Sequence, residues 1–297
     1  MNIKIKGNTK IRNELDKIAA EDNVLNSYLF LGKDGIGKKE IALEFAKKIL
    51  CPTKNEICNC KSCICFESNN HPDIQILNLD GETLKINTIR EMIQNIYEKP
   101  ILSNKKIYII NDSDKMTKEA QNSLLKTLEE PPEYAVIILI ASNLNLLLNT
   151  IKSRCTKIVF EDLSQNEIEE ILKEKNIDVQ NNMEELFDGS IGKAIKVLEK
   201  KEIYKQADEF ISILNKKDKI NFFLKGKEVF IKEEINEILE YMIVVLFQKI
   251  KKENNIQYLE CIKILQETIN RLKSNSNFDM SIDNMLFRLW EELNKWQ

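Results

Sequence analysis

Two groups of residues in the first third of this 297-residue chain have the types and spacing of chemical sites. The first contains three of the eight glycines, Gly32, Gly35 and Gly37, which lie within six residues and run into Lys38. This is the G-x-x-x-x-G-K spacing of a phosphate-binding loop, in which backbone N–H groups surround phosphates and the lysine pairs with them. The spacing predicts the fold of a P-loop protein. The alternative is that these glycines form an ordinary turn.

The residues that would hold Mg²⁺ around this loop are altered. A working loop places Ser or Thr after the lysine, whereas Lys39 is a cation that repels the metal. The strand expected over 106–110 runs into Asn111, which is neutral where a metal-binding acid is needed, and then into Asp112, which is shorter than the usual glutamate. We therefore expect a degenerate phosphate loop and a degenerate acidic motif. Independent ATP hydrolysis is not expected, and retained nucleotide binding is left open.

The second group is a cluster of cysteines. Five of the seven cysteines fall within fifteen residues, at Cys51, Cys58, Cys60, Cys63 and Cys65. In a cytoplasmic chain, disulfides are rare and tetrahedral zinc is the usual reason for such density. A closed four-thiolate site is structural and not catalytic, so we expect structural zinc. Two cysteines separated by a single residue can reach the same metal ion only with difficulty, so the identity of the fourth ligand is left open.

Composition excludes several classes of protein. The 47 acidic and 44 basic residues leave a net charge of -3, which gives no general attraction to nucleic acid. The longest apolar runs, 136–141 and 241–247, are much shorter than the roughly 18 residues of a membrane span. The charged start of the chain lacks the pattern of a secretory signal peptide. We expect a globular protein in the cytoplasm with no membrane contact.

The elements that would position these sites alternate between strands and helices. Strands are predicted over 28–31, 74–77, 106–110, 135–140 and 157–160. Helices are predicted over 10–20, 38–50, 86–97 and 117–130. Because the strands are continuous apolar runs, the pattern predicts a parallel sheet covered on both faces, which is an α/β P-loop domain.

After residue 160 the pattern becomes helical. Residues 133–297 contain no proline and only three glycines, which suits long helices. A capping box at Ser164 and Glu167 opens a helix over 165–173, and the helical stretch breaks at 188–190. Further helices are predicted over 203–214, 227–250, 258–272 and 282–296. We predict three domains: an α/β domain over 1–160 with a zinc module at 51–65, a helical lid over 161–201, and an all-helical collar or oligomerisation domain over 202–297.

Several runs together resemble one family. They are LFLGKDGIGKKEIA, KKIYIINDSDKM, TKEAQNSLLKTLEEPPE and the triplet Ser153-Arg154-Cys155. Across roughly residues 5–160 the chain resembles the bacterial AAA+ clamp-loader proteins of DNA polymerase III. Within that family it is most similar to the delta-prime type, which is the member expected to lack a working ATPase site. The resemblance also implies that Gly192 stands where a motor subunit carries the nucleotide-sensing arginine of its lid. Together with Lys39 and Asn111, this is the third position at which a group that serves ATP hydrolysis is missing.

The resemblance implies a place in an assembly. The chain would be a non-hydrolysing member of a five-membered ring with delta and gamma/tau subunits, which opens the sliding clamp and places it on primer-template DNA. Ser153 and Arg154 would belong to the family's Ser-Arg-Cys motif, whose arginine reaches into the ATP site of the neighbouring motor subunit. An arginine that only pairs with a carboxylate at the domain edge is the alternative.

The resemblance also bears on the cysteines. The family places four zinc ligands after the phosphate-loop helix, with spacings from which this chain departs. The best set is then Cys51, Cys58, Cys60 and Cys63, with Cys65 as a possible substitute for Cys58. We interpret His71, beside Pro72, as a turn residue. Buried packing is the expected role of Cys155 and Cys261.

Two other functions fit parts of the chain. Lys38 and Asp112 suit an active gamma/tau-like motor ATPase whose metal has unconventional ligands. The cysteines suit a zinc-containing DNA-binding protein outside any ring, although the balanced charge disfavours it. The helix over 86–97 and the loop to residue 104 face the clamp or the DNA in the family, or else simply pack on their own sheet.

Overall fold

The computed structural model describes residues 6–53, 58–78, 81–177, 184–214, 216, 218–253 and 257–294. The chain forms two compact units, one made of residues 1–178 and 189–193, the other of residues 179–188 and 194–297. The three-part division expected at residues 160 and 201 stays a prediction. Among the residues described, no helix combines the length and apolar character that a membrane crossing requires.

A five-stranded sheet organises the first unit. Its strands are β1 (Ser27–Leu31), β2 (Ile74–Leu77), β3 (Lys106–Ile110), β4 (Ala135–Ala141) and β5 (Thr156–Val159). They pair in parallel in the order β2-β3-β4-β1-β5. The central strands β3 and β4 are buried along their whole length, as continuous apolar runs require in a sheet covered on both faces. The predicted parallel α/β sheet is confirmed.

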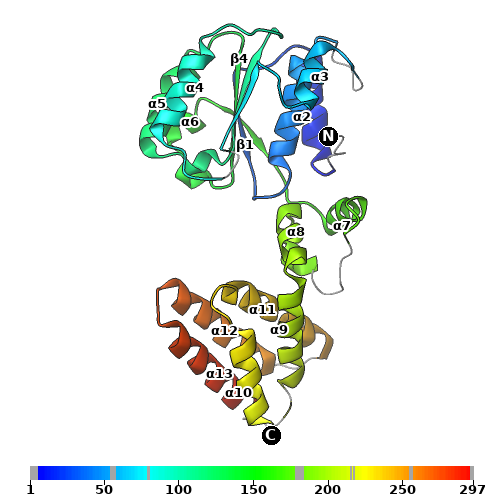
Figure 1. Ribbon diagram of the computed structural model, residues 1–297, viewed down its shortest axis with the longest axis vertical. Coiled ribbons are helices and arrows are strands. Elements are labelled where there is room, and N and C mark those ends of the chain that lie inside the picture. The colour runs from blue at the N-terminus through cyan, green and yellow to red at the C-terminus, as the bar shows by residue number, and fades with distance from the viewer. Residues whose placement is uncertain are drawn as a thin grey trace. The chain divides into compact units, whose positions relative to one another are not determined.

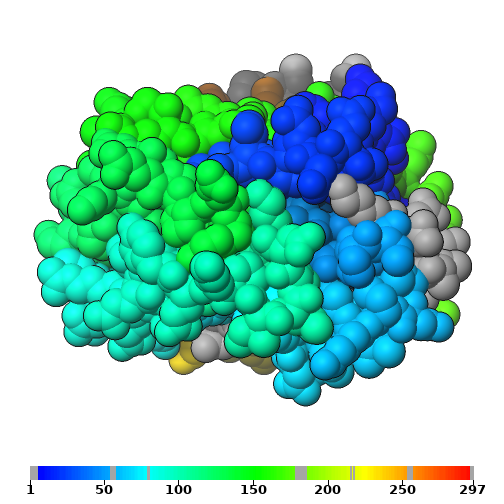
Figure 2. Space-filling model, turned by 90° about the horizontal axis from the view of Figure 1, so that it is seen from above, coloured from blue at the N-terminus to red at the C-terminus, as the bar shows by residue number. Residues whose placement is uncertain are grey.

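Helices cover both faces of this sheet (Figure 1). On one face lie α1 (Thr9–Ala20), α2 (Lys38–Leu50) and α3 (Lys61–Glu67), and on the other lie α4 (Ile86–Ile96), α5 (Lys118–Glu129) and α6 (Asn149–Lys152). Figure 2 shows the azure segment that contains α3 on one side of this unit and the cyan to green segments of α4 and α5 on the other. The cysteine segment therefore lies across the sheet from α4 and α5.

Local sequence sets the ends of several helices. The Thr117 side chain accepts a hydrogen bond from the Ala120 amide and so caps the start of α5, within the helix predicted over 117–130. Ser164 and Glu167 form the predicted capping box at the start of α7 (Gln165–Glu174). Short 3₁₀ turns occur at η1 (Ser113–Lys115), η2 (Leu144–Leu146) and η3 (Glu184–Phe187). Of the helical stretch predicted between residues 162 and 200, residues 178–183 lie outside the described part.

Helix α8 (Ile191–Glu199) begins in the first unit and continues into the second, whose other helices are α9 (Lys201–Ile213), α10 (Lys219–Val229), α11 (Ile235–Glu253), α12 (Gln257–Lys273) and α13 (Phe278–Asn294). Aromatic side chains join α9, α10 and α13, with the ring of Phe222 5.1 Å from that of Phe210 and 5.3 Å from that of Trp290. The single helix predicted over 227–250 is wrong, because residues 230–234 connect two helices. Of the helix predicted over 282–296, residues 295 and 296 lie outside the described part.

Candidate metal centre and phosphate loop

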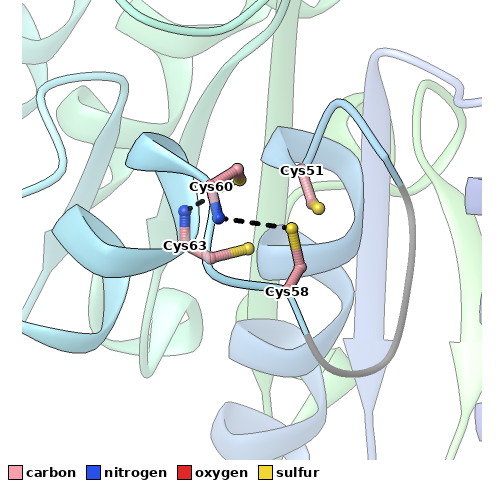
Figure 3. A group of neighbouring side chains, drawn as sticks. All are labelled: Cys51, Cys58, Cys60 and Cys63. Atoms are coloured by element: carbon pink, nitrogen blue, oxygen red, sulfur yellow. Dashed lines mark hydrogen bonds between the residues drawn. The ribbon is translucent and has the colours of Figure 1, made fainter.

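The thiol groups of Cys51, Cys58, Cys60 and Cys63 converge beside the end of α2 and the start of α3 (Figure 3). Their sulfur atoms all lie within 4.8 Å of one another. Tetrahedral zinc with Zn–S bonds of about 2.3 Å separates its sulfur ligands by roughly 3.8 Å, so a small adjustment suffices to bind the ion. Two of the thiols are buried and two are half-buried, which suits a closed structural site. The donor set and its geometry therefore fit zinc.

Polar contacts support negative charge on these sulfurs. The amide of Cys60 donates to the Cys58 sulfur and the amide of Cys63 donates to the Cys60 sulfur, each over 3.4 Å. Burial opposes ionisation of Cys51, but contacts with Thr53 and neighbouring thiols outweigh it and lower the pKa of the Cys51 thiol to about 6. Burial raises the pKa of Cys63, and its thiol neighbours raise it further. The Cys51 thiol thus ionises readily beside the Cys63 thiol, which loses its proton more easily once a bound cation compensates for the charge.

Cys65 and His71 lie near the cluster but do not belong to the group of four converging ligand atoms. His71 is buried, and its Nε2 lies 2.9 Å from the hydroxyl of Ser62, while its Nδ1 accepts the amide of Asp73 over 3.1 Å. Since Nδ1 accepts, Nε2 carries the proton. Burial lowers the pKa of His71, which favours this neutral ring.

Lys38 of the phosphate loop is directed at the loop itself. Its ammonium donates to the carbonyl oxygens of Gly32 over 2.5 Å and Lys33 over 2.6 Å. The residue is only 6% exposed, and burial lowers the pKa of its ammonium. Gly35 and Gly37 have φ values of +73° and +93°, which favour glycine. The loop therefore has the backbone of a phosphate loop, with its lysine hydrogen-bonded internally.

The loop is also in direct contact with the start of α8. The Gly192 amide donates to the Gly35 carbonyl over 2.9 Å, and the Ser190 hydroxyl donates to the Asp34 carbonyl over 2.7 Å. A Cβ on Gly192 would lie 2.8 Å from the Gly35 Cα, and a Cβ on Gly35 would lie 2.5 Å from the Ser190 hydroxyl oxygen. Two glycines thus allow one backbone to pack on the other. A side chain at position 192 would meet the loop's own backbone.

The residues of the acidic motif have partners other than a metal. The Asn111 side chain donates to the Asn78 carbonyl over 3.3 Å, which links the ends of β3 and β2. Asp112 adopts a left-handed conformation with φ of +45°, and its carboxylate accepts from Lys115 over 3.0 Å. Lys39 is half-buried at the start of α2. None of these three side chains makes a described hydrogen bond to the phosphate loop.

Sequence patterns did not reveal the role of Asp114. Its carboxylate is buried, and Oδ2 accepts hydrogen bonds from the amides of Ser142 and Asn143 and from the Ser142 hydroxyl, over 2.8–3.1 Å. The acid thereby joins the end of β3 to the end of β4, the edge of the sheet to which the phosphate loop belongs. An aspartate two residues after Asp112 is the only sequence signal for this contact.

Arg154 lies between α6 and β5, beside Ser153. Its guanidinium is ion-paired with the Glu129 carboxylate and donates to the Thr150 carbonyl over 2.8 Å and to the Ser153 hydroxyl over 3.3 Å. The Arg154 side chain is 31% exposed. Cys155 is buried, and burial raises the pKa of its thiol to about 12. The arginine thus has the carboxylate partner that the alternative interpretation requires, together with an accessible face.

Comparison with known proteins identifies the family. The family model described as "DNA polymerase III, delta subunit" matches residues 7–164, which is more than half of the chain. The delta' subunit of DNA polymerase III from Bacillus subtilis is 39% identical over 159 residues, covering 53% of this chain and 48% of the relative. The gamma/tau subunit from Mycoplasma genitalium is 32% identical over 203 residues, covering 65% of this chain and 34% of the relative.

The matched region thus spans about half or less of these relatives. Among solved structures, a DNA polymerase III gamma subunit-related protein from Thermotoga maritima aligns over 95% of this chain and 99% of its own length, with a TM-score of 0.57 and 19% identity. That likeness concerns the fold alone. The family match and the relatives agree with the phosphate loop and sheet described above. The chain belongs to the family of DNA polymerase III clamp-loader subunits of the delta-prime type.

Proposed function

We propose that this protein acts as a non-hydrolysing subunit of a clamp loader and supplies Arg154 to the ATP site of a neighbouring subunit. The ring would also contain delta and gamma/tau subunits, and it would place the sliding clamp on primer-template DNA during replication. Direct contacts to the clamp and to DNA would be shared with those partners, since the net charge of -3 gives no general attraction to DNA.

The observation that carries the proposal is the combined state of the phosphate loop. Lys38 hydrogen-bonds the loop's own carbonyls, and Gly192 packs on Gly35. Lys39 and Asn111 provide neither the hydroxyl nor the carboxylate that usually holds Mg²⁺. The site keeps the shape of a phosphate loop and has lost the groups that bind the metal, so we propose that it serves as part of the scaffold.

Arg154 supports the second half of the proposal. A guanidinium placed at the γ-phosphate stabilises the charge of the transition state, and arginine fingers change rates by about 10³ to 10⁵ in other phosphoryl-transfer systems. Its pair with Glu129 is partly exposed, so exchanging that carboxylate for a phosphate costs little. Ser153 lies beside it and accepts one of its hydrogen bonds.

The cysteine cluster is proposed as a structural zinc site. Cys51, Cys58, Cys60 and Cys63 would hold the ion, and zinc would cross-link the end of α2 to the start of α3. Such a closed thiolate site adds folding free energy and takes no part in hydrolysis.

A second candidate function is that of a gamma/tau-like motor. The match to the Mycoplasma genitalium gamma/tau subunit covers 65% of this chain, more than the 53% covered by the match to the Bacillus subtilis delta' subunit. This candidate requires Lys38 to release Gly32 and Lys33 and to bind ATP with Mg²⁺.

Two measurements separate the candidates. The purified chain is mixed with candidate delta and gamma/tau subunits, and light scattering after size exclusion tests for one defined complex. The chain alone is then assayed for ATP hydrolysis with Mg²⁺. We expect a complex and no hydrolysis. Turnover by the isolated chain that disappears in Lys38→Ala would establish the motor, and failure to assemble with any of these subunits would reject a place in the ring.

A further inference from the structure

A network of buried polar groups connects the cysteine cluster to a loop on another part of the first unit. We infer that metal binding at the four cysteines fixes the conformation of residues 101–103 through His71 and Asp73. This coupling requires the metal centre proposed above and does not depend on a place in the clamp loader.

The network begins at the residue before Cys51. The carbonyl oxygen of Leu50, the last residue of α2, accepts the Ser62 hydroxyl over 2.8 Å and the Ser103 hydroxyl over 3.1 Å. Ser62 immediately precedes Cys63 in α3 and is 5% exposed. One carbonyl therefore holds both the metal-binding helix and the distant loop. Because Leu50 precedes Cys51 and Ser62 precedes Cys63, a shift of these two cysteines would also move the Leu50 carbonyl and the two hydroxyl groups that donate to it.

His71 makes the second connection between the same segments. Its Nε2 lies 2.9 Å from the Ser62 hydroxyl and 3.3 Å from the Ser103 hydroxyl. Its Nδ1 accepts the Asp73 amide over 3.1 Å, which fixes the ring against the start of β2. In Figure 2 the azure segment that contains α3 borders the cyan-green segment that follows α4.

Asp73 completes the network at the loop. Its carboxylate is 0% exposed and accepts three backbone amides, from Ile101 over 2.6 Å and from Leu102 and Ser103 over 2.7 Å each. A buried carboxylate is stable only while such donors surround it, so the loop and Asp73 depend on each other. Three consecutive backbone amides of this loop are thereby held by one side chain.

The loop has a surface that depends on this support. Ile101 is 82% exposed, and Tyr97, just after α4, is 54% exposed. In the part of the chain that the structure describes, the amides of Ile101, Leu102 and Ser103 donate to Asp73 in the interior of the unit. Metal binding would thus determine the shape of an exposed apolar surface that lies 34 to 38 residues along the chain from the last ligand, Cys63.

Thermodynamic linkage gives the coupling two measurable sides. If metal binding stabilises the ordered loop, the ordered loop stabilises the bound metal by the same factor, so a change that weakens the contacts of the loop also weakens metal binding. Ser103→Ala removes one hydroxyl from the network and leaves the loop amides and all four cysteines intact. Ser68→Ala is the matched control, since Ser68 follows α3 directly but its hydroxyl donates to the Cys65 carbonyl, outside the network.

The experiment uses the full chain, with metal content measured in every sample. Amide hydrogen exchange of residues 101–103 is compared in zinc-loaded and chelator-treated protein, and zinc affinity is measured by competition with a chromophoric chelator. We expect about tenfold or greater loss of protection on metal removal, the size expected from hydrogen bonds to a charged group. We also expect severalfold weaker zinc binding in Ser103→Ala and unchanged binding in Ser68→Ala.

The outcomes separate the site from the coupling. Absence of zinc in protein purified without chelators would reject the metal site itself. Zinc that binds stoichiometrically, with equal exchange at residues 101–103 in both forms and equal affinity in Ser103→Ala, would overturn the coupling and leave the metal site standing. His71→Ala is expected to lose protection at the same three amides even with zinc bound. If that variant does not fold, the comparison of Ser103→Ala with Ser68→Ala still tests the coupling.

Discussion

Arg154 and Glu129 form an ion pair between the segment that follows α6 and the last residue of α5. The Arg154 side chain is 31% exposed and that of Glu129 is 48% exposed. The Thr150 carbonyl and the Ser153 hydroxyl accept further hydrogen bonds from the same guanidinium. The guanidinium is therefore held by three acceptors of the same unit, one of which is a partly exposed carboxylate.

The first prediction concerns the strength of that pair. Glu129→Gln removes the negative charge while keeping a hydrogen-bond acceptor. Because both side chains are partly exposed, we expect the free energy of unfolding to change by less than about 1 kcal/mol. Urea denaturation of the wild type, Glu129→Gln, Arg154→Gln and the double variant gives the coupling energy. A coupling of several kcal/mol would mean that Arg154 is held too tightly to act on a partner.

The second prediction concerns the metal ligands. Cys58→Ser removes one of the four converging thiols, and we expect the purified protein to lose most of its zinc and to unfold at a lower temperature. Cys65→Ser removes a thiol outside the cluster and should retain about one equivalent of zinc. Metal analysis together with thermal denaturation checks both variants. Loss of zinc in Cys65→Ser with retention in Cys58→Ser would assign the fourth ligand to Cys65.

The third prediction concerns the contact between the phosphate loop and α8. Gly192→Ala places a methyl group 2.8 Å from the Gly35 Cα, where backbone leaves no room. We expect a loss of about 1–3 kcal/mol in the free energy of unfolding, as for other overpacked sites. The neighbouring exposed Lys193→Ala serves as the control and should change it by less than about 0.5 kcal/mol. Equal stability of the two variants would show that the loop opens freely.

The fourth prediction concerns nucleotide. Since Lys39 and Asn111 supply neither the hydroxyl nor the carboxylate that usually holds Mg²⁺, we expect Mg²⁺ to leave the affinity of the isolated chain for ATP unchanged. Calorimetric titration with Mg²⁺ and with excess EDTA measures this directly. Mg²⁺-dependent tightening of tenfold or more, abolished in Lys38→Ala, would instead indicate a working metal site.

The sheet could be predicted closely from the sequence because its strands are buried on both faces. Such strands are unbroken apolar runs, and β2 and β3 begin and end at the predicted residues. Thr117 and Ser164 marked helix starts because capping depends on neighbouring residues alone.

Features that depend on distant contacts were not predictable in this way. Residues 230–234 separate α10 from α11, and the Phe230 ring packs 5.1 Å from that of Phe210 in α9, a contact that the local pattern does not reveal. The short helix α3 contains the weak helix formers Ser62, Cys63 and Cys65 and is capped by the Cys60 side chain. Asp73 and Asp114 accept amides 28–30 residues away, for which periodicity has no signature.

The central claim is that Arg154 acts in the ATP site of another subunit. The direct test is the clamp- and DNA-stimulated ATPase rate of the reconstituted complex with Arg154→Ala, compared with Lys157→Ala, an exposed cation on the adjacent strand. The account predicts that Arg154→Ala lowers the rate by about half or more while the complex still assembles, and that Lys157→Ala retains it. Equal rates for the two variants in fully assembled complexes would contradict it.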